Sequence, residues 1–214
     1  MSIGKPNPTR HAKRREASRQ EILTAAWEVA REQGIGGVTL REIAERIGMQ
    51  PPSLYSHFPS KMAIYDAMYQ QGWEEYLEVV RHIEPRLPER PRAALATVAA
   101  QFFDFALAEP ARAQLMNERV VPGFEPTAEA YAPAVAVLEH LRTTLTRLGA
   151  SDEAAADLFT AVLGGLVSQQ IANEPGGRRW RRLLDRAIDM YADEVGIPGP
   201  RLAARTQPTG GGHS

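Results

Sequence analysis

The fold is decided by residues 39–64, which read TLREIAERIGMQPPSLYSHFPSKMAI. Thr39 followed three residues later by Glu42 forms a capping box: the threonine oxygen accepts an unpaired backbone N–H and the glutamate reaches back. The apolar residues that follow share one helical face: Leu40, Ile43, Ala44 and Ile47. Gly48 then ends this helix after about two turns.

A second short helix follows almost immediately. Pro51 and Pro52 fit its first turn, where a missing N–H costs nothing. We expect it to continue to Phe58 and to end at Pro59. Leu54 and Phe58, four residues apart, should face the supporting helices. That orientation leaves four side chains outside or at the edge: Ser53, Tyr55, Ser56 and His57.

The segments on either side complete a small helical unit. Upstream, one apolar face is formed by Ile22, Ala25, Ala26, Val29 and Ala30, before a stop at Gly34. Downstream, Ser60 is expected to cap a longer helix. Two short helices joined by a tight glycine turn form a helix-turn-helix, in which the second helix protrudes into the DNA major groove and the others brace it.

The rest of the chain is also predicted to be helical, because no stretch alternates in the manner of a strand. The fold class is therefore all-α. Further helices are expected at about 91–109, 131–148, 152–173 and 178–195. The first of these contains Phe102, Phe103 and Phe105, and a proline-rich loop is expected over 121–126.

Composition excludes several classes of protein. The 214 residues include no cysteine, which excludes a disulfide scaffold, a thiolate metal site and a cysteine nucleophile. The five histidines show no metal-binding spacing, and no phosphate-binding glycine loop or serine nucleophile motif is present. We expect no signal peptide and no membrane span, no cofactor, no metal and no enzyme activity, and a cytoplasmic location.

The net charge of −1 conceals an asymmetry. Residues 1–61 contain ten Lys and Arg against six Asp and Glu, and residues 62–214 contain fifteen against twenty. A basic first part on an acidic remainder is typical of a protein whose first part contacts a polyanion, and the alternative is a chance split of the charges. We expect residues 1–17 to form a flexible basic arm that assists binding in the DNA minor groove.

Residues 22–64 resemble the DNA-binding domain of the TetR family of transcriptional regulators. The series Gly48-Met49, Leu54-Tyr55, His57-Phe58 and Lys61 matches the family in order and spacing. The resemblance implies a three-helix helix-turn-helix domain at 18–63 and a helical ligand-binding and dimerisation domain at 64–195. Residues 196–214 are expected to be a disordered tail. Ala30 stands where the family often has Phe.

The same resemblance implies which residues contact double-stranded DNA. Phosphate contacts are expected from Thr39, Tyr55, His57 and Lys61, with Arg41 a further DNA-binding candidate. Base-reading positions are occupied by Gln50, Pro51, Pro52 and Ser53. Gln50 replaces the serine common at its position and can bond adenine bidentately, whereas the prolines offer only apolar contact, for instance to a thymine methyl.

The resemblance also implies an effector site and a homodimer. Candidate ligand-binding residues are Phe103, Met116, Phe124, Leu163 and Gln170. Few charges lie on these faces, which favours an apolar or amphipathic small molecule. Candidate dimer-interface residues are Gly164, Val167, Ile171, Trp180, Leu184 and Ile188. The alternative is that this face is buried against its own chain.

These expectations describe a repressor that leaves a palindromic operator when an effector binds. A two-fold dimer matches a palindrome because each recognition helix needs an equivalent half-site. The competing hypothesis is a helical ligand-binding or interaction protein without DNA function, in which Tyr55, His57 and Lys61 have no special role.

Overall fold

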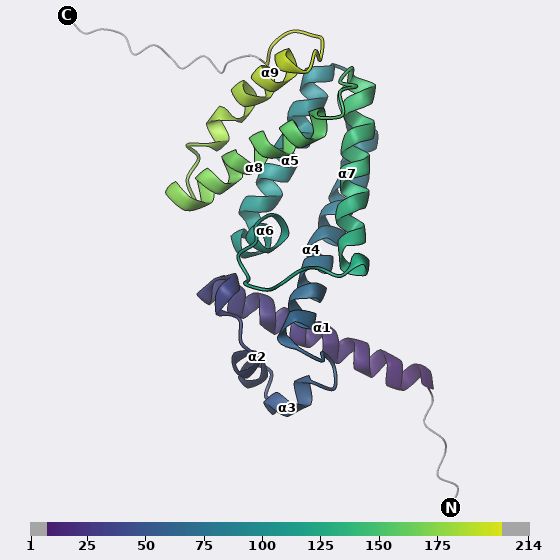
Figure 1. Cartoon of the computed structure of the whole chain (residues 1–214), viewed down its shortest axis with the longest axis vertical. Coiled ribbons are helices and arrows are strands. Elements are labelled where there is room, and N and C mark those ends of the chain that lie inside the picture. The colour runs from purple at the N-terminus through teal and green to yellow at the C-terminus, as the bar shows by residue number, and fades with distance from the viewer. Residues whose placement is uncertain (1–7, 203–214) are drawn as a thin grey trace, which may run out of the picture. The chain divides into compact units, whose positions relative to one another are not determined.

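The computed structural model describes residues 8–202, with side chains from residue 12 onward. This part of the chain is all-α, as predicted, and forms nine α-helices and three short 3-10 turns without a strand (Figure 1). The helices are α1 (Pro8–Gln33), α2 (Leu40–Arg46), α3 (Pro51–Leu54), α4 (Lys61–Ile83), α5 (Pro91–Ala108), α6 (Pro110–Asn117), α7 (Ala128–Leu148), α8 (Ala155–Asn173) and α9 (Leu184–Glu194). The 3-10 turns are η1 (Ile35–Gly37), η2 (Glu84–Arg86) and η3 (Arg181–Leu183).

The chain divides into two compact units that are discontinuous in sequence. Unit 1 comprises Met1–Glu78 and Ala108–Val137, and unit 2 comprises Val79–Leu107 and Leu138–Ser214. Most of α4, all of α6 and the first half of α7 therefore belong with the helix-turn-helix. The boundary expected between residues 63 and 64 falls inside the first turn of α4.

The flexible arm expected at 1–17 is wrong for residues 8–17, which are the first turns of α1. Residues 12–17, rich in good helix formers, extend a helix that is already nucleated, and each added residue then needs no new nucleus. Pro8 is compatible with this because a helix tolerates proline at its first position. Residues 1–7 lie outside the described part of the chain.

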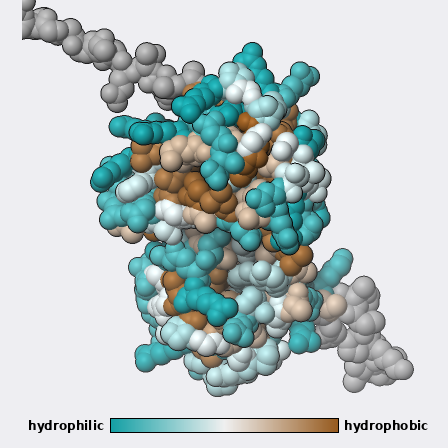
Figure 2. Space-filling model, turned by 45° about the horizontal axis from the view of Figure 1, so that its top comes forward, coloured by the Kyte–Doolittle hydropathy of each residue, from teal (hydrophilic) through white to brown (hydrophobic). Residues whose placement is uncertain are grey.

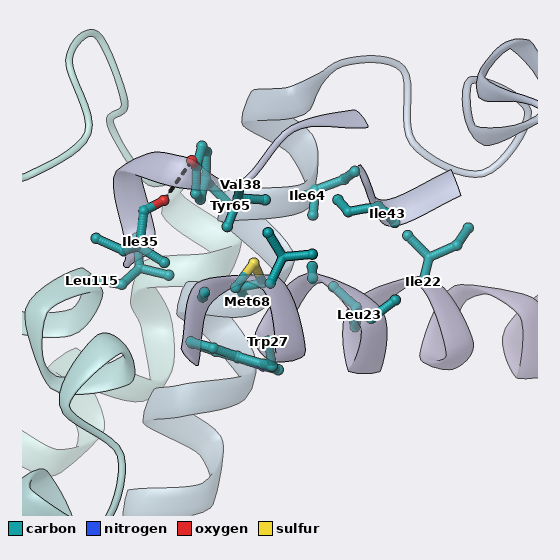
Figure 3. Close-up of a cluster of buried hydrophobic side chains, with 14 of the residues drawn as sticks. Ile22, Leu23, Trp27, Ile35, Val38, Ile43, Ile64, Tyr65, Met68 and Leu115 are labelled. Atoms are coloured by element: carbon teal, nitrogen blue, oxygen red, sulfur yellow. Dashed lines mark hydrogen bonds between the residues drawn. The ribbon is translucent and has the colours of Figure 1, made fainter. Parts of the chain in front are cut away.

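The core of unit 1 lies between α1, α2 and α4 (Figure 3). Ile22, Ile43 and Ile64 are completely buried there. The Tyr65 hydroxyl donates to the carbonyl of Ile35 at 2.8 Å, which fixes η1 against α4. The indole of Trp27 donates to Gln71 Oε1 at 3.0 Å, so α1 and α4 are joined by a side-chain hydrogen bond as well as by apolar packing.

In unit 2, a buried charge cluster joins α5 to α9. The guanidinium of Arg92 donates to Asp189 at 3.2 Å and to Asp193 at 2.5 Å. The buried side chains of α8 and α9 include Phe159 and Tyr191, whose rings meet edge to face at 5.4 Å. The Tyr191 hydroxyl also donates to the carbonyl of Ala155 at 2.9 Å.

The tail expected to be disordered from residue 196 is ordered through residue 202, so that expectation is wrong for 196–202. Gly196 has a φ of 76° and lets the chain turn back, so that the Ile197 N–H bonds the carbonyl of Ala192 at 2.8 Å. Ile197 is buried, and the Leu202 N–H donates to both carboxylate oxygens of Asp189. Residues 203–214 lie outside the described part.

Replacing Tyr65 by Phe should lower the free energy of unfolding by about 1–2 kcal/mol, because the Ile35 carbonyl loses its buried donor. Urea unfolding followed by circular dichroism measures this loss. Tyr55→Phe is the matched control, since Tyr55 is 55% exposed and its hydroxyl should not contribute to stability. Equal stability of the two variants would contradict the assigned role of Tyr65.

Candidate nucleic-acid interface

The first short helix of the pair, α2, is capped as its sequence predicts. The Thr39 hydroxyl accepts the Glu42 backbone N–H at 3.2 Å and donates to the Glu42 carboxylate at 2.7 Å. Gln33 also donates to that carboxylate, at 2.5 Å. These hydrogen bonds, with Thr39 first, hold the pKa of Glu42 below its ordinary value. A DNA phosphate would have to displace Glu42 from the Thr39 hydroxyl.

The turn after α2 depends on Gly48. Its φ is 66°, a left-handed conformation that residues with a Cβ rarely adopt. The Met49 N–H returns to the Ala44 carbonyl at 2.9 Å, which closes the end of α2. The chain then leaves in the extended conformation at Gln50, whose carbonyl accepts the Ser53 N–H at 2.8 Å.

The second short helix is shorter than expected. Helix α3 covers only Pro51–Leu54, and a turn continues to His57 rather than a helix to Phe58. A helix of four residues spans about one turn, and the N–H groups of a first turn have no partner within the helix, so few internal hydrogen bonds sustain it. The carbonyl of Leu54 accepts both the His57 N–H, at 2.9 Å, and the Phe58 N–H, at 2.8 Å.

The side chains of this segment point as predicted. Leu54 and Phe58 are buried, with exposed fractions of 0% and 1%. The Tyr55 side chain is exposed, so it does not pack away against α4. The other exposed members of the segment are Gln50, Pro52, Ser53 and Ser56, and Pro51 and His57 are half-buried.

Sequence reasoning missed the residue that supports this segment from α1. Arg19 donates to the carbonyl of His57 at 2.6 Å, and its guanidinium carbon lies 4.2 Å from the centroid of the Phe58 ring. Cation–π contact and a charge-assisted hydrogen bond together hold the end of the turn. Arg19 lies one helical turn before Leu23 on the buried side of α1, and this spacing was the available signal.

Lys61 occupies the first residue of α4. The Ser60 hydroxyl accepts the Ala63 N–H at 3.1 Å, which confirms the predicted cap. The Lys61 ammonium lies 5.3 Å from the centroid of the Tyr65 ring. A cation at the positive end of a long helix adds to the attraction for an anion.

Two arginines of α2 differ in how firmly they are paired. Arg41 bonds Glu45 at 2.8 Å, but its side chain is 82% exposed, so this ion pair contributes little and is easily exchanged. Arg46 donates through two nitrogens to Glu32, at 2.8 Å and 2.6 Å, which ties α2 to α1. Arg41 therefore remains a candidate for DNA contact, and Arg46 supports the fold.

The expected ligand-binding residues fall in both units. Met116 lies against Gly72 and Phe124 packs on the rings of Tyr65 and Tyr69, all in unit 1. Phe103, Leu163 and Gln170 belong to unit 2 and are buried there.

Gln170 is not a free polar anchor for a ligand, and this expectation is corrected. Its amide nitrogen donates to the Glu174 carbonyl at 2.5 Å. Its amide oxygen accepts the backbone N–H groups of Trp180, at 2.9 Å, and Arg181, at 3.3 Å. The side chain thus stabilises the turn between α8 and η3.

Half of the expected dimer-interface residues are also corrected. Val167, Leu184 and Ile188 are buried within unit 2 of their own chain. The large apolar side chains that are exposed in this unit are Leu158, Leu183 and Met190. Figure 2 shows apolar surface, in brown, gathered on one face of this unit. The pattern of exposed apolar residues on α8 and α9 is out of phase with the face chosen from sequence.

Residues 8–202 contain no helix with the length and apolar character that crossing a membrane demands. Among the same described residues, no three His, Asp or Glu side chains are grouped so that they could hold a metal ion.

Comparison with known proteins gives the same assignment for the first part of the chain. Residues 22–68 match the family model for bacterial regulatory proteins of the tetR family. The class A tetracycline repressor of Escherichia coli is 30% identical over 183 residues, covering 82% of this chain and 81% of that protein. The transcriptional activator FasR of Mycolicibacterium smegmatis is 35% identical over 91 residues, 42% of this chain and 41% of that protein.

Solved structures share the fold. The regulator FadR of Bacillus subtilis, in complex with stearoyl-CoA, superposes with a TM-score of 0.66 at 17% identity, covering 84% of this chain and 99% of that one. A tetR-family regulator from Rhodococcus gives 0.63 at 20% identity, covering 85% and 98%. With a relative at 30% identity over about four fifths of both chains and a family-model match over the helix-turn-helix, this chain belongs to the TetR family of DNA-binding transcriptional regulators.

Proposed function

We propose that this regulator is a homodimeric, cytoplasmic repressor that binds a palindromic operator and leaves it when a small apolar or amphipathic effector binds. The observation that carries the proposal is the exposed segment from Gln50 to Ser56, held at the tip of unit 1 by a buried core and by Arg19. Repression is also supported by the similarity to a protein named as a repressor, although another relative is named as an activator.

The phosphate contacts come from the rim of this tip. Tyr55 is exposed and can donate its hydroxyl to a phosphate oxygen. His57 Nδ1 is buried and has no partner among the described residues, so Nε2 is the nitrogen for a DNA contact. Lys61 adds its charge at the start of α4, and Arg41 and Thr39 contribute after exchanging their bonds to Glu45 and Glu42.

Base reading falls to the short stretch from Gln50 to Ser53. Gln50 precedes α3 in an extended conformation, and its side chain makes no capping bond. Pro51 and Pro52 present apolar surface in place of N–H donors, which suits thymine methyl groups. One amide side chain and one hydroxyl then provide the hydrogen bonds to base edges.

Dimerisation is supported by two glycines inside α8. A Cβ built at Gly164 or Gly165 meets no atom within 4 Å, so packing within this chain requires neither glycine. A glycine inside a helix costs about 1 kcal/mol relative to alanine. A second copy that approaches α8 closely would explain their presence, together with exposed Leu158, which lies two turns before Gly165 on the same face of the helix.

Aromatic side chains support an apolar effector. In unit 1 the Tyr69 ring stacks on Tyr131 at 6.3 Å, and Trp73 meets both Tyr69 and Tyr76. Burial, the largest cause, raises the pKa of Tyr69 to about 12, and burial also raises the pKa of Tyr76. Tyrosine is already neutral at physiological pH with its ordinary pKa of about 10, and burial keeps these two side chains uncharged at still higher pH.

The links within unit 1 indicate how an effector could act on DNA binding. Arg31 of α1 bonds Glu109 before α6 at 2.6 Å, and Arg112 of α6 bonds Glu75 of α4 at 2.6 Å. An effector that moves α6 or α4 would shift the helix-turn-helix with them. Release requires that the effector bind the displaced state more tightly.

The proposal is tested by footprinting the protein on the DNA upstream of its own gene. We expect a protected site with two-fold symmetry, and loss of protection when one member of a panel of apolar and amphipathic compounds is added. A protein that binds no DNA in a salt-sensitive manner would overturn the DNA role. DNA binding that activates transcription of the neighbouring gene would overturn repression alone.

Tyr55→Phe and Lys61→Ala should each weaken binding about equally on specific and unrelated duplexes, because phosphates carry no base identity. Lys61→Ala should also lower the slope of log K against log salt by about 0.9 per subunit. Fluorescence anisotropy over a range of salt concentrations measures both effects. Unchanged affinity in both variants would remove these phosphate assignments.

Gln50→Ala should weaken binding selectively at one base pair, costing about 1–3 kcal/mol there and relaxing the preference for adenine. Selection of bound duplexes from a randomised half-site reads out the preference. Glu153→Ala is a control with an exposed side chain in unit 2, outside α8. An unaltered base preference in Gln50→Ala would show that Gln50 does not read sequence.

Replacing both Gly164 and Gly165 by Ala should leave the monomer fold intact or raise its helical stability, since each new Cβ enters open space. The same change should weaken the dimer, because the added methyl groups separate the two copies. Sedimentation equilibrium and thermal unfolding report the two effects separately. An unchanged dimerisation constant would contradict an interface at these glycines.

A further inference from the structure

The N-terminal half of α1 carries positive charge that the mechanism above does not use. Lys13, Arg14 and Arg15 are exposed, and no ion pair joins them to any residue in the described part of the chain. Figure 1 shows that these first turns of α1 project beyond α4, on the side of unit 1 where α3 lies. The feature is therefore a rigid basic projection next to the DNA-reading segment.

Helical spacing assigns one of these residues to the DNA side. Arg15 precedes Arg19 by four residues, so both lie on the same face, one turn apart. Arg19 contacts the His57 carbonyl and the Phe58 ring in the turn that follows α3. Arg15 thus continues this face past the edge of the helix-turn-helix. Lys13 points about 160° away from Arg15 around the helix.

The helical state of residues 8–17 also prevents the backbone of this segment from lying in the minor groove as an extended arm would. An α-helix with its side chains is about 10–12 Å wide, whereas the minor groove of B-DNA is about 6 Å wide. In the proposed complex, α3 occupies the major groove of the half-site. A helix beside the recognition segment therefore lies over the sugar-phosphate backbone, which is the first part of the duplex that its side chains meet.

We propose that Arg15 binds a DNA phosphate flanking the base pairs read by α3, so that the first turns of α1 extend the footprint on each half-site without adding sequence specificity. This proposal rests on the DNA-binding function above. Two observations support it: the charge of the exposed Arg15 is complementary to phosphate, and its face is continuous with Arg19, which already touches the recognition turn.

The test compares Arg15→Ala, Arg15→Lys and Lys13→Ala with the unaltered full-length protein on its own operator. Salt titration of binding should show that Arg15→Ala lowers the slope of log K against log salt by about 0.9 per subunit. Arg15→Lys should keep most of the slope, since a point charge suffices at a phosphate. Lys13→Ala, on the opposite face of the same helix, should behave like the unaltered protein.

A second measurement uses the length of the duplex. Lengthening the operator by a few base pairs of arbitrary sequence on each side should tighten binding of the unaltered protein, and should have a much smaller effect on Arg15→Ala. Equal slopes and equal length dependence in Arg15→Ala and the unaltered protein would overturn the proposal while leaving operator binding intact. A loss that depends on the flanking sequence would also overturn it, because that result indicates groove reading.

If the unaltered protein itself binds no DNA, the proposed function fails first. Urea unfolding of each variant checks the fold, and Arg15 and Lys13 are both exposed, so no change is expected.

Discussion

The DNA-reading segment of this protein contains a helix of only four residues, which is not stable without packing against the rest of the domain. Helix α3 begins with two prolines and contributes few backbone hydrogen bonds, far fewer than an independent helix needs. Its position comes from outside: Leu54 and Phe58 are inserted in the core, and Arg19 holds the following turn. Tyr55 and the other exposed residues of this segment keep their positions because Leu54 and Phe58 are fixed in the core.

The parts of the fold that local chemistry determines were predictable from sequence. The Thr39 cap and the Gly48 turn follow from single-residue properties, and the burial of Leu54 and Phe58 follows from their spacing. The resemblance of residues 22–64 to the TetR family then identified these helices as a DNA-binding domain. The cap and the turn depend on contacts between residues a few positions apart, and the helical spacing of Leu54 and Phe58 shows which of their sides faces the core.

Features that depend on distant parts of the chain were not predictable in the same way. Gln170 looks like a polar anchor in sequence, and only the turn that brings Trp180 beside it shows that it is occupied. The apolar face of α9 was assigned to a dimer interface because the sequence pattern of such a face is the same whether it packs against its own chain or against a second copy. The order of residues 196–202 depends on Asp189, which lies on α9 and also bonds Arg92 of α5.

The account can be tested most directly by hydrogen–deuterium exchange of the full chain with and without its operator duplex. It predicts slower exchange on DNA binding in the segment from Met49 to Lys61 and in the described N-terminal turns of α1, with α8 and α9 protected equally in both states. Unchanged exchange at residues 49–61, with new protection confined to unit 2, would contradict the claim that this braced segment is the DNA-binding surface.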